Sequence, residues 1–269
     1  MALPYYKQHW IDIEQSRFSI YDSLLGYHPR MAPLLAPLDV QPGQSVLDVG
    51  SGPGSITLEF GRRVGSDGQA VGVDINATFV ERARAQAQHQ GLPQVQYERA
   101  DFPPLPFADQ AFDRVFCKNV LEYVDSAATT VREIARVAKP GGKVVLIDSD
   151  WDMLALDASD EALHDRVLQA VTSTATKEPR IGRKLPRLCQ AAGLTDITTR
   201  IFASPDRVGH ALPMLEKSLY HYATVSGAVS QAEADAWLAD IKARLDSGEY
   251  FFCLPQFLIA ATKSPHSPL

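Results

Sequence analysis

The 269-residue sequence has few cysteines and no long apolar run. Its three cysteines, Cys117, Cys189 and Cys253, show no Cys-x-x-Cys spacing, and their odd number indicates reduced, mostly buried thiols, none of them a favoured nucleophile. No apolar run approaches the ~20 residues of a membrane span, and the first ten residues lack the pattern of a secretory leader. We therefore expect a soluble, cytoplasmic protein without a membrane partner.

The sequence also lacks an excess of basic charge. It has 26 lysines and arginines against 32 aspartates and glutamates, a net charge of −6, and no basic cluster interleaved with aromatic residues. This composition argues against a nucleic-acid partner. With 45% hydrophobic residues, the chain can bury a full core as one domain with an appended cap. A monomer and a homodimer both stay open.

Residues 46–54 read Val-Leu-Asp-Val-Gly-Ser-Gly-Pro-Gly, an apolar strand that runs directly into Gly50, Gly52 and Gly54. Glycines at a strand-to-helix turn let the backbone approach a ligand and present the N–H groups of the next helix to it. The dinucleotide fingerprint Gly-x-Gly-x-x-Gly would need Gly or Ala at position 55, which is serine here. The pattern present, Asp48 followed by three alternate glycines, resembles that of class I S-adenosylmethionine-dependent methyltransferases.

Further strand ends follow in the order that this resemblance implies. Asp74 ends an apolar run where a doubly wound fold brings a second strand beside the first, so its carboxylate is expected to accept both ribose hydroxyls of S-adenosylmethionine. Asp101 and the aromatic residue after it look like the family's adenine clamp, and Asn119 ends a fourth strand. The resemblance thus assigns these residues to the cofactor: Asp48, Gly50, Gly52, Gly54, Asp74, Ile75, Asp101, Phe102 and Asn119.

Strand and helix patterns alternate along most of the chain. Strands are predicted over 45–49, 69–74, 94–99, 112–118, 143–149, 197–202 and 250–262, and helices over 54–64, 76–90, 126–138, 159–175, 181–192, 207–225 and 230–245. Right-handed crossover connections then favour helices on both faces of a parallel sheet. The resemblance implies an α/β, Rossmann-like, doubly wound sheet of seven mostly parallel strands, with an antiparallel last strand and a helical lid.

The methyltransferase core is expected over 41–203 together with 249–263. The helical pieces of residues 1–40 are interpreted as an N-terminal lid. A tight hairpin needs only a few residues, so 204–248 is interpreted as a helical insertion that caps the acceptor.

Methyl transfer from a sulfonium depends on alignment and on exclusion of water, with a general base only where the acceptor keeps its proton. The candidate bases are His9 and His210, and the candidate acceptor contacts are Tyr6, Tyr21, Trp151 and His221. For each histidine the alternative is a surface or helix-packing role, and for each tyrosine it is a place in the core with a bonded hydroxyl.

Asp148, Asp150 and Asp152 alternate at the end of the fifth strand, as metal ligands do in some catechol-type methyltransferases. No further Asp or Asn cluster with suitable spacing supports such a site. We therefore predict no metal, with Asp148 structural and the other two on a solvated rim.

The residues after Asn119 exclude two acceptor classes. They read Val-Leu-Glu-Tyr, whereas enzymes that methylate base amines or glutamine amides have Pro-Pro and an aromatic residue there. Arginine methyltransferases of this fold hold the guanidinium with two glutamates, and only Glu122 is available here. The chain resembles the group of quinone C-methyltransferases and bacterial small-molecule O- and N-methyltransferases. We expect methylation of a small-molecule acceptor in biosynthetic or secondary metabolism. The alternatives are a quinone-pathway C-methyltransferase and a catalytically silent regulatory protein that binds S-adenosylmethionine.

Overall fold

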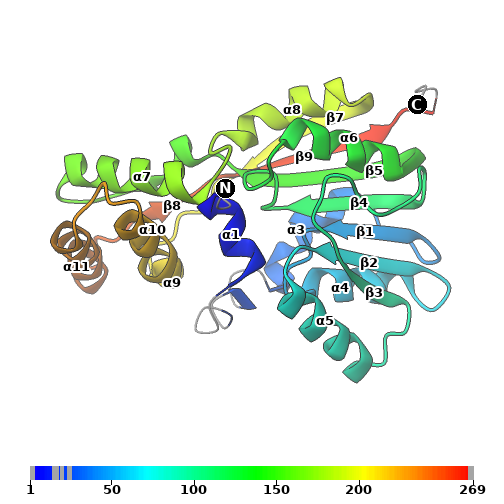
Figure 1. The fold of residues 1–269 in the computed structure, drawn as a ribbon, viewed down its shortest axis with the longest axis horizontal. Helices are drawn as coiled ribbons and strands as arrows, with labels where there is room; N and C mark the ends of the chain where they lie inside the picture. Colours follow the sequence, from blue (N-terminus) through cyan, green and yellow to red (C-terminus); the bar gives the residue numbers. More distant parts are fainter. Residues whose placement is uncertain (1–3, 14–17, 19–20, 23–25, 266–269) are drawn as a thin grey trace.

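The computed structural model describes residues 4–13, 18, 21–22 and 26–265 (Figure 1). Its main sheet contains β1 (Ser45–Val49), β2 (Gln69–Asp74), β3 (Val95–Arg99), β4 (Phe112–Lys118), β5 (Ala138–Ser149), β7 (Leu194–Phe202) and β9 (Gln256–Lys263). The seven strands lie in the order β3-β2-β1-β4-β5-β9-β7, and β9 is antiparallel to both of its neighbours. The predicted α/β Rossmann-like fold with an antiparallel last strand is confirmed.

Helices cover both faces of this sheet, which explains why the central strands bury apolar side chains on both faces. On one face, α6 (Ala127–Val137) and α8 (Ile181–Ala191) pack against β4 and β5. On the other, α4 (Ser55–Val64) and α5 (Ala77–His89) cover β1, β2 and β3 (Figure 1). The carboxyl ends of β1, β2, β4 and β5 therefore meet at one edge.

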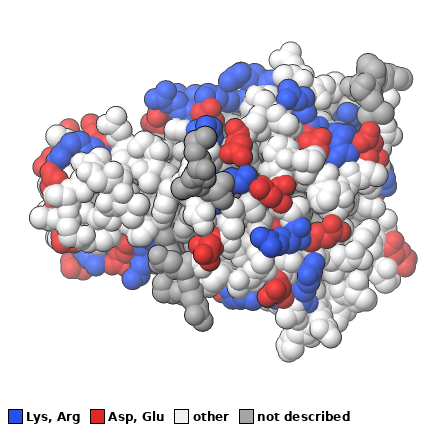
Figure 2. Space-filling view, in the orientation of Figure 1, with Lys and Arg blue, Asp and Glu red and all other residues white. Residues whose placement is uncertain are grey.

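A second group of helices extends beyond that edge (Figure 1). It comprises α7 (Glu161–Ala175), α9 (Leu212–Met214), the π-helical turn η5 (Leu215–Leu219), α10 (Tyr220–Val225) and α11 (Gln231–Ser247). We call these helices the cap. They share a hydrophobic cluster of their own, which includes Val167, Leu215 and Trp237. Figure 2 shows both signs of charge spread over the sheet half of this face, whereas the middle of the cap is mostly uncharged.

The predicted strand over 250–262 is wrong as one element. It divides into β8 (Phe252–Cys253), which pairs with β6 (Ala155–Leu156) in a separate two-stranded sheet, and β9. Pro255 lies between the two strands and has no N–H to donate to a ladder.

The predicted helix over 207–225 starts later, with α9. The preceding residues instead turn around Asp206, whose carboxylate accepts hydrogen bonds from the N–H groups of Val208 (3.0 Å) and Ala211 (2.7 Å). A carboxylate that binds nearby N–H groups in this way favours a turn over a helix.

At the amino-terminal end, α1 (Tyr5–Ile11) lies between the sheet and the cap (Figure 1). The short helices η2 (Pro29–Met31), α3 (Ala32–Leu35) and η3 (Ala36–Leu38) then lead to β1. Within the described ranges, no helix combines the length and the apolar character needed to cross a membrane.

Candidate active site

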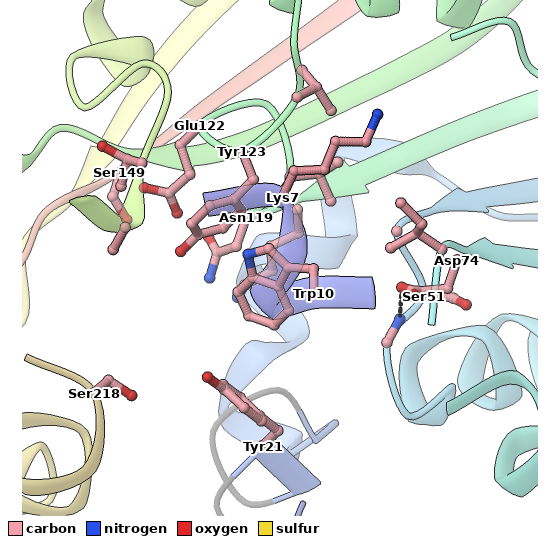
Figure 3. A pocket seen from close by; sticks show the side chains of 18 of the residues that line it. Lys7, Trp10, Tyr21, Ser51, Asp74, Asn119, Glu122, Tyr123, Ser149 and Ser218 are labelled. Carbon is pink, nitrogen blue, oxygen red and sulfur yellow. Dashed lines mark hydrogen bonds between the residues drawn. The ribbon is translucent and has the colours of Figure 1, made fainter. Parts of the chain in front are cut away.

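A cavity of about 340 Å³ lies at the carboxyl ends of β1, β2, β4 and β5 and continues under α1 and the cap (Figure 3). This is where open α/β sheets bind ligands. Of the predicted site residues, the cavity is lined by Asp48, Gly50, Gly52, Asp74, Ile75, Asp101, Phe102, Asn119, Tyr21 and Trp151. Ten residues chosen from widely separated segments therefore meet at one place.

The glycine turn after β1 has a backbone that other residues rarely adopt. Gly50, Gly52 and Gly54 have φ values of 73°, 52° and 88°, all in the left-handed region. A Cβ added to Gly50 would lie 2.1 Å from Cγ2 of Val120, so the turn also packs too closely for a side chain. Gly54 does not line the cavity; it precedes α4.

Asp74 holds the glycine turn from the end of β2. Its Oδ2 accepts a hydrogen bond from the Gly52 N–H (2.8 Å), and its Oδ1 accepts one from the Asn76 N–H (2.9 Å). Burial raises the pKa of the Asp74 carboxyl, and these backbone donors act in the opposite direction. Asp74 lines the cavity, and a carboxylate has about four lone-pair sites, so it can accept further hydrogen bonds from hydroxyl groups of a ligand.

Asp48 lies beneath the same turn. Its Oδ2 accepts a hydrogen bond from Oγ1 of Thr57 (2.6 Å) on the first turns of α4. Burial raises the pKa of Asp48 to about 7, although the Thr57 hydrogen bond opposes that shift. The side chain thus links β1 to α4 under the ligand-facing backbone.

Polar atoms without partners point to a polar ligand. In the described part of the chain, buried side-chain atoms that lack a hydrogen-bond partner include Ser51 Oγ, Asn119 Oδ1 and Gln256 Oε1, and all three residues line this cavity. Buried polar atoms are normally bonded, and exceptions mark places where a ligand supplies the missing contact. Asn119 has a φ of 54°, so the chain leaves β4 in a left-handed turn at this residue.

The end of the cavity beside Asp101 is covered by α1. Lys7 Nζ lies 3.1 Å from Asp101 and 3.0 Å from Asp125, both of which line the cavity. Asp101 is therefore already paired, a feature that the sequence did not predict. Asn76 Nδ2 donates a hydrogen bond to the Trp10 carbonyl (3.0 Å), which ties the end of α1 to the turn after β2.

The far half of the cavity is largely aromatic and aliphatic. The rings of Trp10 and Tyr123 have centroids 4.9 Å apart, and those of Trp10 and Tyr21 lie 5.2 Å apart. The cap and the segments next to it complete this half with Trp151, Ala175, Ala211, Met214, Leu219, Tyr222, Phe252 and Leu254. Such a surface suits an apolar ligand group and excludes water.

Besides Gly54, four of the predicted residues do not line the cavity. His9 is buried behind Tyr21, with 2.6 Å between His9 Nε2 and the Tyr21 hydroxyl. His210 is exposed. The Tyr6 hydroxyl donates a hydrogen bond to Asp125, and Nε2 of His221 lies 2.7 Å from the Tyr5 hydroxyl. Of the two candidate bases, only His9 thus reaches the cavity, and only through Tyr21.

Glu122 and Tyr123 line the cavity, although the sequence pattern did not assign them to the site. Glu122 is 2% exposed, and Nε1 of Trp151 donates a hydrogen bond to its Oε2 (2.5 Å). Burial raises the pKa of Glu122 well above its usual value, and the negative charge of Asp148 acts in the same direction. Charged residues are rarely fully buried, so this carboxyl is a candidate for chemistry.

The three alternating aspartates after β5 have protein partners. Asp148 accepts hydrogen bonds from the N–H groups of Leu121 (2.9 Å) and Ser149 (3.1 Å). Asp150 forms an ion pair with Arg183, and Asp152 pairs with Arg180 at 2.6 Å. Their roles in the structure are to hold the turn after β4 and to fasten the start of α8.

A family model described as "Methyltransferase domain" matches residues 41–208. A 37.1 kDa protein of transposon TN4556 from Streptomyces fradiae is 29% identical over 86% of this chain and 66% of that protein. The ubiquinone/menaquinone biosynthesis C-methyltransferase of Serratia proteamaculans is 32% identical over 54% of this chain and 59% of its own length. The chain thus spans about two thirds or less of these relatives.

The fold is also similar to that of solved structures. The Haemonchus contortus phosphoethanolamine N-methyltransferase 2, in complex with S-adenosyl-L-methionine, has a TM-score of 0.63 and 17% sequence identity. The similarity covers 98% of this chain and 61% of that one.

Proposed function

We propose that this chain, which belongs to the methyltransferase domain family, is an S-adenosylmethionine-dependent methyltransferase whose acceptor is a small, largely apolar molecule. The observation that carries this proposal is the continuity of one cavity from the glycine turn to the aromatic half beneath the cap. A donor and an acceptor in the same cavity can be aligned for in-line transfer.

The first half of the cavity fits the donor. Gly50 and Gly52 allow close backbone approach, the Asp74 carboxylate faces the place for ribose hydroxyls, and the unpaired Oδ1 of Asn119 is available to an ammonium group. Ile75 and Phe102 supply apolar contact for a flat base. The bound donor supplies an electrophilic methyl group on a positively charged sulfur.

The second half fits the acceptor. Trp10, Tyr21 and Trp151 line this half, and aromatic faces favour a nearby positive charge such as a sulfonium. Exclusion of water from this half leaves the nucleophile and the cationic donor poorly solvated, which favours a reaction that discharges the cation. In this proposal α1 is the lid and the insertion over 204–248 selects the acceptor.

Isothermal titration calorimetry with S-adenosylhomocysteine tests the donor half, and release of S-adenosylhomocysteine on addition of an acceptor panel tests the acceptor half. The panel contains alkylphenols, alkylamines and polar amino acids of similar length. We expect one bound nucleoside per chain and turnover confined to apolar acceptors. Turnover of the polar amino acids in preference to the alkyl compounds would contradict the proposal.

A quinone-pathway C-methyltransferase is the second candidate, because the relative from Serratia proteamaculans carries that name. That similarity covers 54% of this chain. A demethylmenaquinol analogue with a short prenyl tail distinguishes the two candidates. Carbon methylation of this analogue, with no turnover of alkylphenols or alkylamines, would favour the quinone pathway.

A further inference from the structure

Glu122 lies at the junction between the two halves of the cavity. It lies three residues after Asn119 and next to Tyr123 in the sequence, and Trp10 and Tyr21 lie across the cavity (Figure 3). Only 2% of its surface is exposed. A ligand that bridges the two halves must pass this carboxyl.

The backbone around Glu122 is held from two directions. Asp148 Oδ2 accepts the Leu121 N–H (2.9 Å), which fixes the turn after β4. The Glu122 carbonyl accepts the N–H groups of Lys177 (2.8 Å) and Glu178 (3.1 Å) from the segment after α7. The carboxyl is thus placed by β4, β5 and the cap together, and its direction is fixed by the hydrogen bond from the Trp151 indole.

We propose that Glu122 is a catalytic residue that takes the proton from the O–H or N–H group of the acceptor, an inference that rests on the proposed function. The acceptor heteroatom forms a bond to the methyl carbon while the carbon–sulfur bond breaks and its electron pair passes to sulfur. The proton of the heteroatom moves to the Glu122 carboxylate and later to water. Trp151 is a positioning residue for this carboxylate.

Several titratable groups face Glu122 or its immediate neighbours: Asp148 on β5, Lys118 on β4, Tyr123 on the same turn, and Tyr21 and Tyr222 across the cavity. Burial and the Asp148 charge raise the pKa of Glu122, whereas the Trp151 hydrogen bond lowers it. A carboxyl with a raised pKa is a more effective base near neutral pH. Loss of the indole N–H should therefore raise the pKa of Glu122 further.

Binding of simple probes tests the proposal without a known acceptor. We would titrate the S-adenosylhomocysteine complex with para-hexylphenol, hexylamine and para-hexylanisole, of which the last has no proton to donate. Wild type should prefer the phenol or the amine to the anisole, and Glu122→Gln should reduce that preference at least about tenfold, because a hydrogen bond to a charged group is lost. Glu59→Gln, whose side chain pairs with Arg63 outside the cavity, is the matched control.

The pH dependence separates a proton acceptor from a merely structural residue. The wild-type preference should fall as the pH decreases through the pKa of Glu122, Trp151→Phe should move this fall to higher pH, and Glu122→Gln should show no such fall. If Glu122→Gln loses only the preference for the phenol over the anisole, the acceptor carries an O–H group. If it loses only the preference for the amine over the anisole, the acceptor carries an N–H group.

Two results overturn the proposal while leaving the methyltransferase assignment intact. One is a wild-type complex that binds neither protic probe better than the anisole. The other is a Glu122→Gln variant with wild-type probe preference and pH profile. Failure of the wild-type chain to bind S-adenosylhomocysteine at all would instead count against the proposed function.

Discussion

Replacement of Asp74 by alanine removes the carboxylate that we assign to the ribose of the donor. This side chain is 9% exposed, and its two oxygens accept the N–H groups of Gly52 (2.8 Å) and Asn76 (2.9 Å). A hydrogen bond to a charged group contributes about 1.5–3 kcal/mol. We therefore expect Asp74→Ala to weaken binding of S-adenosylhomocysteine roughly 10- to 150-fold, because each 1.4 kcal/mol is about a factor of ten.

Titration calorimetry on wild type and three variants measures this effect. Asp67→Ala is the control, because Asp67 is exposed and precedes β2, at the opposite end of the strand from Asp74. Asp74→Asn keeps one acceptor oxygen without the charge, so its affinity should lie between those of Asp74→Ala and wild type. Thermal unfolding without ligand checks that the Asp74 substitutions have not unfolded the protein. Equal affinities of folded Asp74→Ala and wild type would refute the ribose assignment.

Three further predictions concern the surroundings of the donor site. Gly54→Ala should lower the free energy of unfolding by about 1–3 kcal/mol. The φ of Gly54 is 88°, and a Cβ added there would lie 2.6 Å from the Cβ of Ala83. An unchanged urea denaturation curve would contradict this prediction. Burial raises the pKa of Asp48 to about 7, so protonation of this group favours the folded state and stability falls as the pH rises from about 4 to 7. Asp48→Asn should lose that part of the pH dependence of the free energy of unfolding. The same pH dependence in the variant and in wild type would contradict this prediction. Lys7→Met breaks the exposed pair with Asp101 and should change global stability by less than about 1 kcal/mol, while making α1 more sensitive to limited proteolysis; unchanged cleavage rates would exclude this role.

The donor half of the site could be predicted from the sequence because its signals are local. Gly50 and Gly52 follow directly on an apolar strand, and Asp74 and Asn119 end the neighbouring strands. The rules for right-handed crossovers bring such strand ends to one edge without further information. Their assignment to the cofactor stays a prediction until a ligand is measured.

The acceptor half depends on contacts between distant segments, which a local pattern does not contain. Glu122 is buried only because Asp148 and the segment after α7 hold its turn, so its sequence context shows no sign of a site. The prediction of His9 and His210 rests on their residue type and on their expected place near the mouth of the crevice; one lies behind Tyr21 and the other is exposed. The sequence shows a glutamate four residues after the end of β4, but it does not show that this residue is buried.

A crystal structure of the protein with S-adenosylhomocysteine tests the central claim most directly. The account predicts the amino-acid tail of the nucleoside beside the glycine turn, the ribose hydroxyls within hydrogen-bond distance of Asp74, and the sulfur directed toward Glu122 and Trp151. A nucleoside bound elsewhere, or one whose ribose lies away from Asp74, would contradict it.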